Sequence, residues 1–404
     1  MAEPAAEVRP LRRAVGPRAA LRLIVSREFS PYFVGNALSA SGTWFQNLAA
    51  AILVFRLTHS ALLLGVLSFA QFAPILFLAP WTGSAADRFD RRRLLLVSQP
   101  AAAVLSATLA FLTQLDVATA ALVIGFGFGQ GIATAFSTPA QQALFASLVP
   151  REEVASAVAL NSMTFNIARA AGPAAAGAAI GGLGIAAAFA INAGSYLAFT
   201  LALVFMRPRR QERPESSRLR DSFGLLRREP RLAVALLIVA AVGFASDPIN
   251  TLAPAFAHAF ERADTFSGYI IGTFGAGAVA AAFALAGREP SRPRTIVALA
   301  VLAAGVTAFS VSPLLSVGLV VLFVAGFGYL ASNTAATSFL QLGVAESERG
   351  RIMTLWSIAF LGLRPLASLT DGAIASAAGV RVAGVVLSLP ALAAAIFLLR
   401  WRRP

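Results

Sequence analysis

Residues 83–96 read GSAADRFDRRRLLL, a short polar stretch that separates two long apolar segments. The flanking segments 61–82 and 94–115 are each near the roughly 20 apolar residues that a helix needs to cross a bilayer. The charged turn between them therefore lies at a membrane face. Its arginines predict the cytoplasmic face, because short loops rich in Lys and Arg stay inside. The simpler alternative is a loop that only sets topology.

The composition is that of a membrane protein with many spans. Hydrophobic residues make up 57% of the 404 residues and charged residues only 13%, against roughly 25% charged in soluble domains. This excludes a water-soluble enzyme. The formal net charge is +14, but the basic residues, all arginine, lie between apolar segments. Topology and anionic lipid headgroups explain that charge, so we expect a lipid bilayer and no nucleic acid as partner.

Twelve apolar segments are expected to be spanning helices, with ends uncertain by about four residues. They are 31–57, 61–82, 94–115, 118–138, 155–182, 184–206, 232–259, 266–287, 294–311, 314–338, 352–377 and 380–399. We predict a cytoplasmic tail over 1–30, a six-helix bundle over 31–206, a cytoplasmic linker over 207–231, a second six-helix bundle over 232–399, and a cytoplasmic tail over 400–404.

The arginines test this topology. With the N-terminus inside, 28 arginines fall on the cytoplasmic side and 3 on the other, with 2 inside spans. That split predicts both termini in the cytoplasm and a multi-pass protein of the cytoplasmic (inner) membrane. Nothing at the N-terminus resembles a cleaved signal.

The charged stretch resembles the loop between helices two and three of the major facilitator superfamily: a glycine and small residues, an Asp-Arg pair, then an arginine-rich turn. The residues that carry the resemblance are Gly83, Asp87, Arg88, Arg91 and Arg92. It implies an all-α transporter of twelve transmembrane helices in two pseudo-symmetric six-helix bundles. It also implies that Asp87 helps to close the cytoplasmic side, against a loop arginine or the N-terminal end of helix eleven.

A second resemblance lies in the fifth span, where residues 161–182 read NSMTFNIARAAGPAAAGAAIGG. This is similar to the fifth-helix motif of the antiporter branch of the superfamily, through Gly172, Pro173 and Gly177 above all. The resemblance implies a bend that favours export, because proline removes a backbone hydrogen bond. A close-packed kinked helix without directional meaning is the alternative.

Three charged residues lie at the depth of the membrane interior. Arg169 is about 14 residues into its span, or ~21 Å of helix, and Arg364 and Asp247 fall at similar depth. Such charges persist where they face a water-filled cavity or pair with one another. They are therefore either a structural ion pair or a substrate and proton site, with Asp247 titrating. Asp371, nearer the outer end of span eleven, is a candidate for gating or pairing.

Polar side chains are denser in several spans than lipid-facing helices allow. In the superfamily, helices one, four, seven and ten line a central cavity, so the resemblance implies a substrate and proton cavity there. Helix-to-helix hydrogen bonding is the alternative for each residue. The cavity candidates, including the charged residues above, are Asn36, Trp44, Gln46, Gln130, Asn161, Asn166, Arg169, Asp247, Asn250, Tyr329, Asn333 and Arg364.

The chain lacks the residues of several other functions. It has no cysteine and two histidines, so we expect no metal centre and no disulfide. No Gly-Lys-Ser follows the glycines at 125–131, so we expect no ATP chemistry and no cofactor. His59 and His258, at the outer ends of equivalent spans, are a possible pH-sensing pair.

Residues 39–65 and 137–162 also resemble the group that contains the enterobactin exporter and the macrolide-efflux proteins. One departure is Gly127, where that branch usually has an arginine three residues before Gln130. The function expected is export of a small organic compound, of drug or siderophore type, by alternating access with proton entry, by a monomer that is not an enzyme. An importer of the same fold and a non-transporting membrane sensor or assembly partner are the alternatives.

Overall fold

The computed structural model describes residues 22–26, 29–145, 148–149, 153–206, 219–345 and 348–401. Every regular element in those ranges is helical. The elements are α2 (Ser30–Thr58), α3 (Ala61–Phe77), α4 (Ala79–Arg88), α5 (Arg91–Gln114), α6 (Ala120–Phe145), α7 (Val154–Leu183), α8 (Ile185–Phe205), α9 (Leu219–Arg228), α10 (Pro230–Thr251), α11 (Ala253–Ala259), η2 (Asp264–Phe266), α12 (Ser267–Ala284), α13 (Arg292–Val311), α14 (Leu315–Leu342), α15 (Arg349–Ser357), η4 (Ile358–Gly362), α16 (Arg364–Ala378) and α17 (Val380–Arg400).

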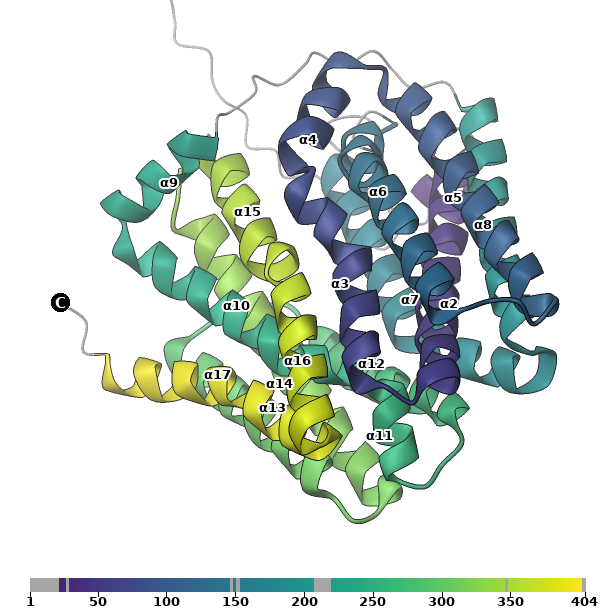
Figure 1. Ribbon diagram of the computed structural model, residues 1–404. Helices are drawn as coiled ribbons and strands as arrows, with labels where there is room; N and C mark the ends of the chain where they lie inside the picture. Colours follow the sequence, from purple (N-terminus) through teal and green to yellow (C-terminus); the bar gives the residue numbers. More distant parts are fainter. Residues whose placement is uncertain are drawn as a thin grey trace, which may run out of the picture.

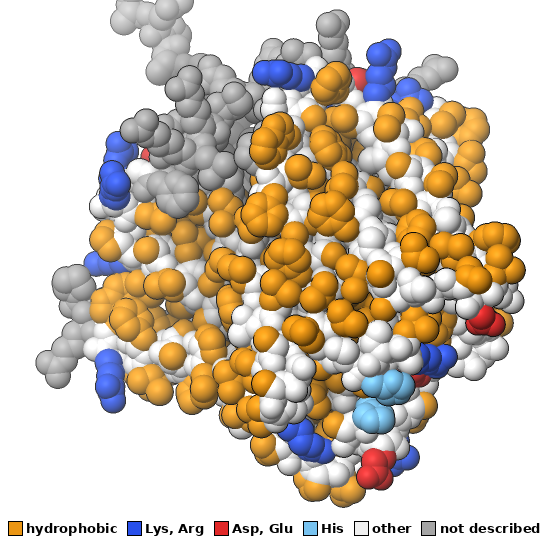
Figure 2. Space-filling view, viewed as in Figure 1, with side chains coloured by type: hydrophobic (Ala, Val, Ile, Leu, Met, Phe, Trp, Pro, Cys, Tyr) orange, Lys and Arg blue, Asp and Glu red, His pale blue; other side chains and the backbone are white. Residues whose placement is uncertain are grey.

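The described part of the chain has the helices of a multi-pass membrane protein. Ten of them are long and apolar enough to cross a bilayer. The two remaining predicted spans correspond to α3 with α4 and to α7, which is consistent with twelve spans. Figure 2 shows apolar side chains over most of the visible surface. Exposed Phe205, Phe283 and Val104 belong to this surface, which lipid rather than water would cover.

The helices form two bundles, α2–α8 and α10–α17 (Figure 1). Their construction repeats. The Arg92 guanidinium, at the start of α5, donates to the carbonyl oxygens of Leu203 and Val204, both at 2.7 Å. The Arg292 guanidinium, at the start of α13, likewise donates to Leu398 at the end of the last helix. The repeat supports two pseudo-symmetric halves, while the domain boundaries stay a prediction.

The contact surface between the halves also repeats. It is formed by α7 against α12 and by α3 against α16. At both crossings glycine meets glycine: Gly177 lies against Gly268, and Gly65 against Gly372. Backbones can approach this closely because a glycine carries no Cβ.

The two ends of each bundle differ in how many arginines they carry. The arginine-rich face contains Arg88, Arg92, Arg228, Arg292 and Arg400, and the arginine-poor face contains Arg56, Arg262 and Arg381. In Figure 1 the helices of the first bundle run towards the top and those of the second towards the left, and the bundles meet at the lower right near α11 and α12. The halves therefore diverge towards the arginine-rich face.

The signature stretch is more helical than the sequence predicts. α4 continues to Arg88 and α5 begins at Arg91, so the turn consists of Phe89 and Asp90 alone. The Asp90 carboxylate accepts from the Arg93 backbone N–H at 2.8 Å. Such an N-cap satisfies a backbone donor that the first turn of a helix leaves free. The polar turn expected across 83–96 is thus corrected to a tight cap between two helices.

Three predicted spans are interrupted. Span two divides at Leu78, four residues after Pro74, and span seven divides at Leu252, four residues after Pro248. Span eleven contains the π-helical turn η4 immediately before Arg364 and Pro365. The proline explains the last break, because it has no N–H to donate to the preceding turn and its ring crowds that turn. π-turns of this kind are frequent at functional sites.

Candidate functional site

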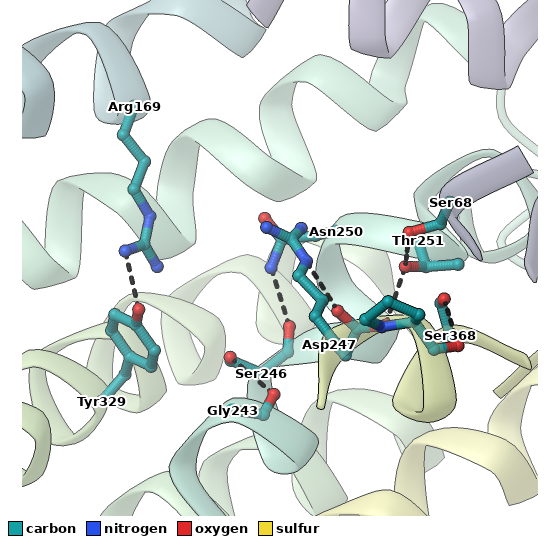
Figure 3. A network of polar contacts seen from close by, with 11 residues as sticks. Ser68, Arg169, Gly243, Ser246, Asp247, Asn250, Thr251, Tyr329 and Ser368 are labelled. Atoms are coloured by element: carbon teal, nitrogen blue, oxygen red, sulfur yellow. Dashed lines mark hydrogen bonds and ion pairs between the residues drawn. The ribbon is translucent and has the colours of Figure 1, made fainter. Parts of the chain in front are cut away.

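An ion pair lies between α10 and α16, deep inside the second bundle. Arg364 Nε donates to Asp247 Oδ1 at 3.0 Å; Asp247 is labelled in Figure 3. The Thr251 hydroxyl donates to Asp247 Oδ2 at 2.9 Å and lies 3.4 Å from the Ser68 hydroxyl of α3. The Asp247 carboxylate is therefore satisfied on both oxygens, and its hydrogen-bond chain reaches the first bundle.

Arg364 extends from this pair to the surface between the halves. Its guanidinium carbon lies 4.2 Å from the centre of the Phe72 ring of α3, a cation–π contact. The Arg364 side chain is 25% exposed, whereas Asp247 is 2% exposed. Arg364 thus stands between the buried acid and the contact surface of the halves.

A small cavity adjoins Arg364 at this surface, with a volume of about 40 Å³. Helices from both bundles line it: the residues are Trp44, Asn47, Leu48, Ala51, Leu64, Leu67, Ser68, Gln71, Phe72, Pro173, Asn250, Thr251, Ile271 and Arg364. Four residues predicted for function are among them, namely Trp44, Pro173, Asn250 and Arg364. Small-molecule sites are typically about 300–1,000 Å³, so in this conformation the cavity has room only for water.

A second cationic contact joins the halves. Arg169, in the middle of α7, donates from Nη1 to the Tyr329 hydroxyl of α14 at 2.7 Å (Figure 3). Its guanidinium carbon lies 4.3 Å from the centre of the Tyr329 ring. Both residues were predicted from the sequence, but their pairing was not. Arg169 and Arg364 thus both contact an aromatic ring of the opposite bundle.

Gln46 and Gln130 lie in a hydrogen-bond network inside the first bundle. The Ser106 hydroxyl donates to Gln46 Oε1 at 2.5 Å, and Asn192 Nδ2 donates to the same oxygen at 2.6 Å. Gln130 Nε2 donates to Ser106 Oγ at 2.8 Å. These are the helix-to-helix bonds that the sequence left open as an alternative to a cavity wall. Ser106 and Asn192 were missed, since single polar residues in apolar spans give no signal of their partners.

The remaining cavity candidates are scattered. Asn36 Nδ2 donates to Asn161 Oδ1 at 2.9 Å, which joins α2 to α7 within the first bundle. Asn333 Oδ1 is buried and has no hydrogen-bond partner among the described residues. The side chain of Asn166 lies outside the described residues. The candidates therefore do not form one continuous polar wall.

The signature residues lie at the arginine-rich face, away from the cavity. Arg92 holds the end of α8, as described above, and Arg88 ends α4. Arg91 is the first residue of α5, and it interacts with another residue. The side chains of Gly83 and Asp87 lie outside the described residues, so the gating role of Asp87 stays a prediction.

The glycines of the fifth-helix motif lie at close contacts. A Cβ built on Gly172 would lie 2.9 Å from the Trp44 Cβ of α2, and one on Gly177 would lie 2.6 Å from the Thr265 carbonyl oxygen in the other bundle. α7 continues through Pro173 without interruption. The motif therefore packs α7 against two neighbours, one of them across the contact surface of the halves.

Asp371, which the sequence marks as a candidate for gating or pairing but not for the cavity, belongs near this site. It lies seven residues after Arg364, two helical turns on the same face of α16, and is 0% exposed. That spacing of seven residues was the signal in the sequence that Asp371 lies on the same side of the helix as Arg364. Within the described ranges, no group of three or more His, Asp or Glu side chains could hold a metal ion.

The fold is shared with solved transporters. A bacterial homologue of the human lysosomal transporter Spinster superposes with a TM-score of 0.76 at 15% identity, over 93% of this chain and 98% of that one. A D-xylose–proton symporter superposes with a TM-score of 0.69 at 14% identity, over 92% and 98%. Two helical bundles that meet around buried charges thus define a multi-pass membrane protein of the major facilitator fold.

Within that class, the chain belongs to the transmembrane secretion effector family, whose model matches residues 19–404. The multidrug efflux pump Tap of Mycolicibacterium fortuitum is 25% identical over 91% of this chain and 94% of that protein. The enterobactin exporter EntS of Shigella boydii is 24% identical over 89% and 91%.

A more similar but shorter match is the staphyloferrin A transporter of Staphylococcus aureus, 32% identical over 36% of this chain and 37% of that protein. The chain matches only part of some relatives. The match spans 37% of the length of the staphyloferrin A transporter and 62% of the length of the transporter YfiS of Bacillus subtilis.

Proposed function

We propose that this protein exports small organic compounds, of drug or siderophore type, across the cytoplasmic membrane by alternating access. The observation that carries the proposal is that Arg169 and Arg364, both in helices of membrane-spanning length, contact aromatic rings across the surface where the two bundles meet, with the buried Asp247 paired to Arg364. The full-length relatives named for multidrug efflux and enterobactin export support the direction and the substrate class.

The proposed orientation places the arginine-rich face in the cytoplasm, together with both termini. The halves diverge towards that face (Figure 1), so a substrate would enter between them from the cytoplasm. Rocking of the halves would then close that entrance and separate the α7–α12 and α3–α16 crossings. The 40 Å³ cavity beside Arg364 would widen during this movement.

We propose that proton entry drives the export of the substrate. The protein is proposed to work as a monomer. Asp247 is an acid in a helix of membrane-spanning length, and its partners Thr251 and Arg364 line the cavity. Acids inside membrane helices serve as proton relays in transporters. The importer alternative has the same fold, and counterflow in oriented vesicles would decide the direction of transport.

One observation favours a non-transporting sensor or assembly partner. Arg364 is paired with Asp247, and Arg169 with Tyr329, so these cations already have partners. The cavity between the halves favours a transporter, because a sealed core would need no space there. Export remains the proposal that accounts for both features.

The test is a susceptibility and accumulation panel in a strain that lacks its own efflux pumps. A macrolide, a catecholate siderophore and lipophilic cations are supplied to cells with the wild-type protein, with Asp87→Asn, or with the exposed Arg93→Gln as control. We expect protection and reduced accumulation for at least one compound, weakened by Asp87→Asn at equal protein levels and unchanged by Arg93→Gln. Equal accumulation with and without the wild-type protein, for every compound, would contradict export.

A further inference from the structure

The Asp371 carboxyl group is fully buried, and no described residue donates a hydrogen bond to it. Its exposure is 0%, and neither of its oxygens has a partner among the described residues. An ionised carboxylate without a donor or a paired cation is one of the most costly groups to place in an apolar interior. Inside a membrane helix an ionised carboxylate is likewise costly. The ionised Asp371 carboxylate therefore needs either a proton or a hydrogen-bond donor to be stable at this place.

One titratable neighbour of Asp371 is another acid, Asp247. The two carboxyl groups of Asp371 and Asp247 lie within hydrogen-bonding reach, and Arg364 is within electrostatic reach of Asp371. Two ionised carboxylates cannot hydrogen-bond, because both are acceptors. A single proton on either one turns the contact into an O–H···O bond and removes one negative charge.

As far as the structure describes the chain, the other elements packed against α16 bring no further cation to this place. α3 carries no charged residue, and η4 carries none. On α17, the Arg381 guanidinium donates to the carbonyl oxygens of Ser310 and Ser312 at the arginine-poor face. On α10, Arg231 lies at the helix start, on the arginine-rich face. Two acids thus share one base, Arg364.

We propose that Asp247, Asp371 and Arg364 form a binding site for one proton, which bridges the two carboxyl groups. With the proton bound the cluster is electrically neutral: one arginine, one carboxylate and one carboxylic acid. Asp247 already accepts from Arg364 and Thr251, so Asp371 is the acid that holds the proton and donates it to Asp247. This deepens the proposed function, because it identifies the coupling proton's site.

Arg364 connects this site to the cavity. It is the member of the cluster that lines the cavity, and it is 25% exposed while the two acids are buried. A cationic substrate group placed beside Arg364 would repel it towards the acids and displace the proton to water in the cavity. That coupling has the sign of proton antiport. An anionic group would draw Arg364 away and favour binding of a second proton.

Infrared spectroscopy of the full-length protein in lipid vesicles tests the site without any substrate. A carboxylic acid has a C=O stretching band that a carboxylate lacks, and solvent-exposed Asp and Glu are ionised at neutral pH. We expect one buried acid band in the wild type at neutral pH. Asp371→Asn and Asp247→Asn should each abolish it, because one acid then pairs with one arginine.

Arg364→Gln should change the intensity of the acid band in the opposite direction. Without the base, both acids should be protonated, so the acid band should double. Asp264→Asn, an acid at the arginine-poor face, is the control and should leave the band unchanged. If Asp371→Asn does not reach the membrane, Asp371→Ser offers a hydroxyl donor to Asp247 and should show the same loss.

The proposal is overturned if the wild type has no acid band, if the band survives Asp371→Asn or Asp247→Asn, or if Arg364→Gln does not increase it. These results do not depend on transport. A correct band pattern in a protein that exports nothing would leave the proton site intact and refute the proposed function. Export that is driven by a proton gradient, with the wrong band pattern, would refute the site alone.

Discussion

At the scale of single residues, the contact between Arg169 and Tyr329 joins the two halves through one side chain from each. It combines a hydrogen bond of 2.7 Å with a guanidinium placed 4.3 Å from the ring centre. The sequence identifies both residues as unusual, because an arginine and a tyrosine hydroxyl are costly in lipid. Their pairing across 160 positions depends on how the bundles dock, which no local pattern contains.

Tyr329→Phe separates the two parts of this contact. It removes the hydroxyl but keeps the ring, so we expect a loss of about 1 kcal/mol, the usual net value of one hydrogen bond. Tyr329→Ala removes the ring as well and should cost more. The measurement is thermal unfolding in one detergent, with the exposed Tyr269→Phe as matched control. A Tyr329→Phe protein as stable as the control would mean that the hydroxyl contributes nothing.

At the scale of elements, α7 shows what the fifth-helix motif does in this protein. Its small residues predict close packing, and the structure identifies the neighbours as α2 at Gly172 and α12 at Gly177. The bend that the resemblance implied stays a prediction. Span eleven shows the limit of pattern reasoning at this scale. Pro365 indicates a disruption, but the π-turn that accommodates it depends on packing around Arg364.

Gly177→Ala should weaken the contact between the halves. The new Cβ would lie 2.6 Å from the Thr265 carbonyl oxygen, so α7 and α12 must move apart, and overpacking of this kind typically costs about 1–3 kcal/mol. We expect a lower unfolding temperature. Gly182→Ala, in the same motif, is the control, because a Cβ there meets nothing within 4 Å. Equal unfolding temperatures for both variants would show that the crossing tolerates a methyl group.

At the scale of the whole molecule, the halves are joined at the arginine-poor face by side chains from α2 and from the region of η2 and α11. The Arg56 Nη2 donates to Asp264 Oδ1 at 2.8 Å, as part of a bidentate ion pair. Beside it, the rings of His59 and His258 lie 6.2 Å apart, with Phe55 against both. This contact closes the face opposite to the one where the bundles diverge.

Arg56→Gln should shift the molecule towards opening at the arginine-poor face. Arg56 is 49% exposed, and exposed ion pairs contribute about 0–1 kcal/mol, which limits the population shift to roughly fivefold. The chain contains no cysteine, so spin labels at Val117→Cys and Leu314→Cys report the distance between the halves directly. The open state should give a longer distance between the two spin labels. This longer distance should be more populated in Arg56→Gln than in the wild type, but not in the control Arg262→Gln.

The charge-reversed pair Arg56→Asp with Asp264→Arg should restore the shorter distance. If the distance distribution is the same in Arg56→Gln and the wild type, the ion pair does not hold this face closed, and the aromatic and histidine contacts are sufficient.

The amino-acid sequence alone predicts the class of this protein and identifies the residues that cannot face lipid. Apolar segments of membrane-spanning length, and the concentration of all but two of the arginines in the connections between them, are local properties, so they can be recognised residue by residue. The same reasoning placed Arg169, Asp247 and Arg364 inside the membrane.

Which polar residues contact one another became visible in the three-dimensional fold. It paired Arg364 with Asp247, 117 positions away, brought Asp371 close to Asp247, and joined Gln46 and Gln130 through Ser106 inside one bundle. The physical reason is that the partner of a buried polar group is set by how helices dock against one another. Docking depends on the shapes of surfaces that lie far apart in the chain.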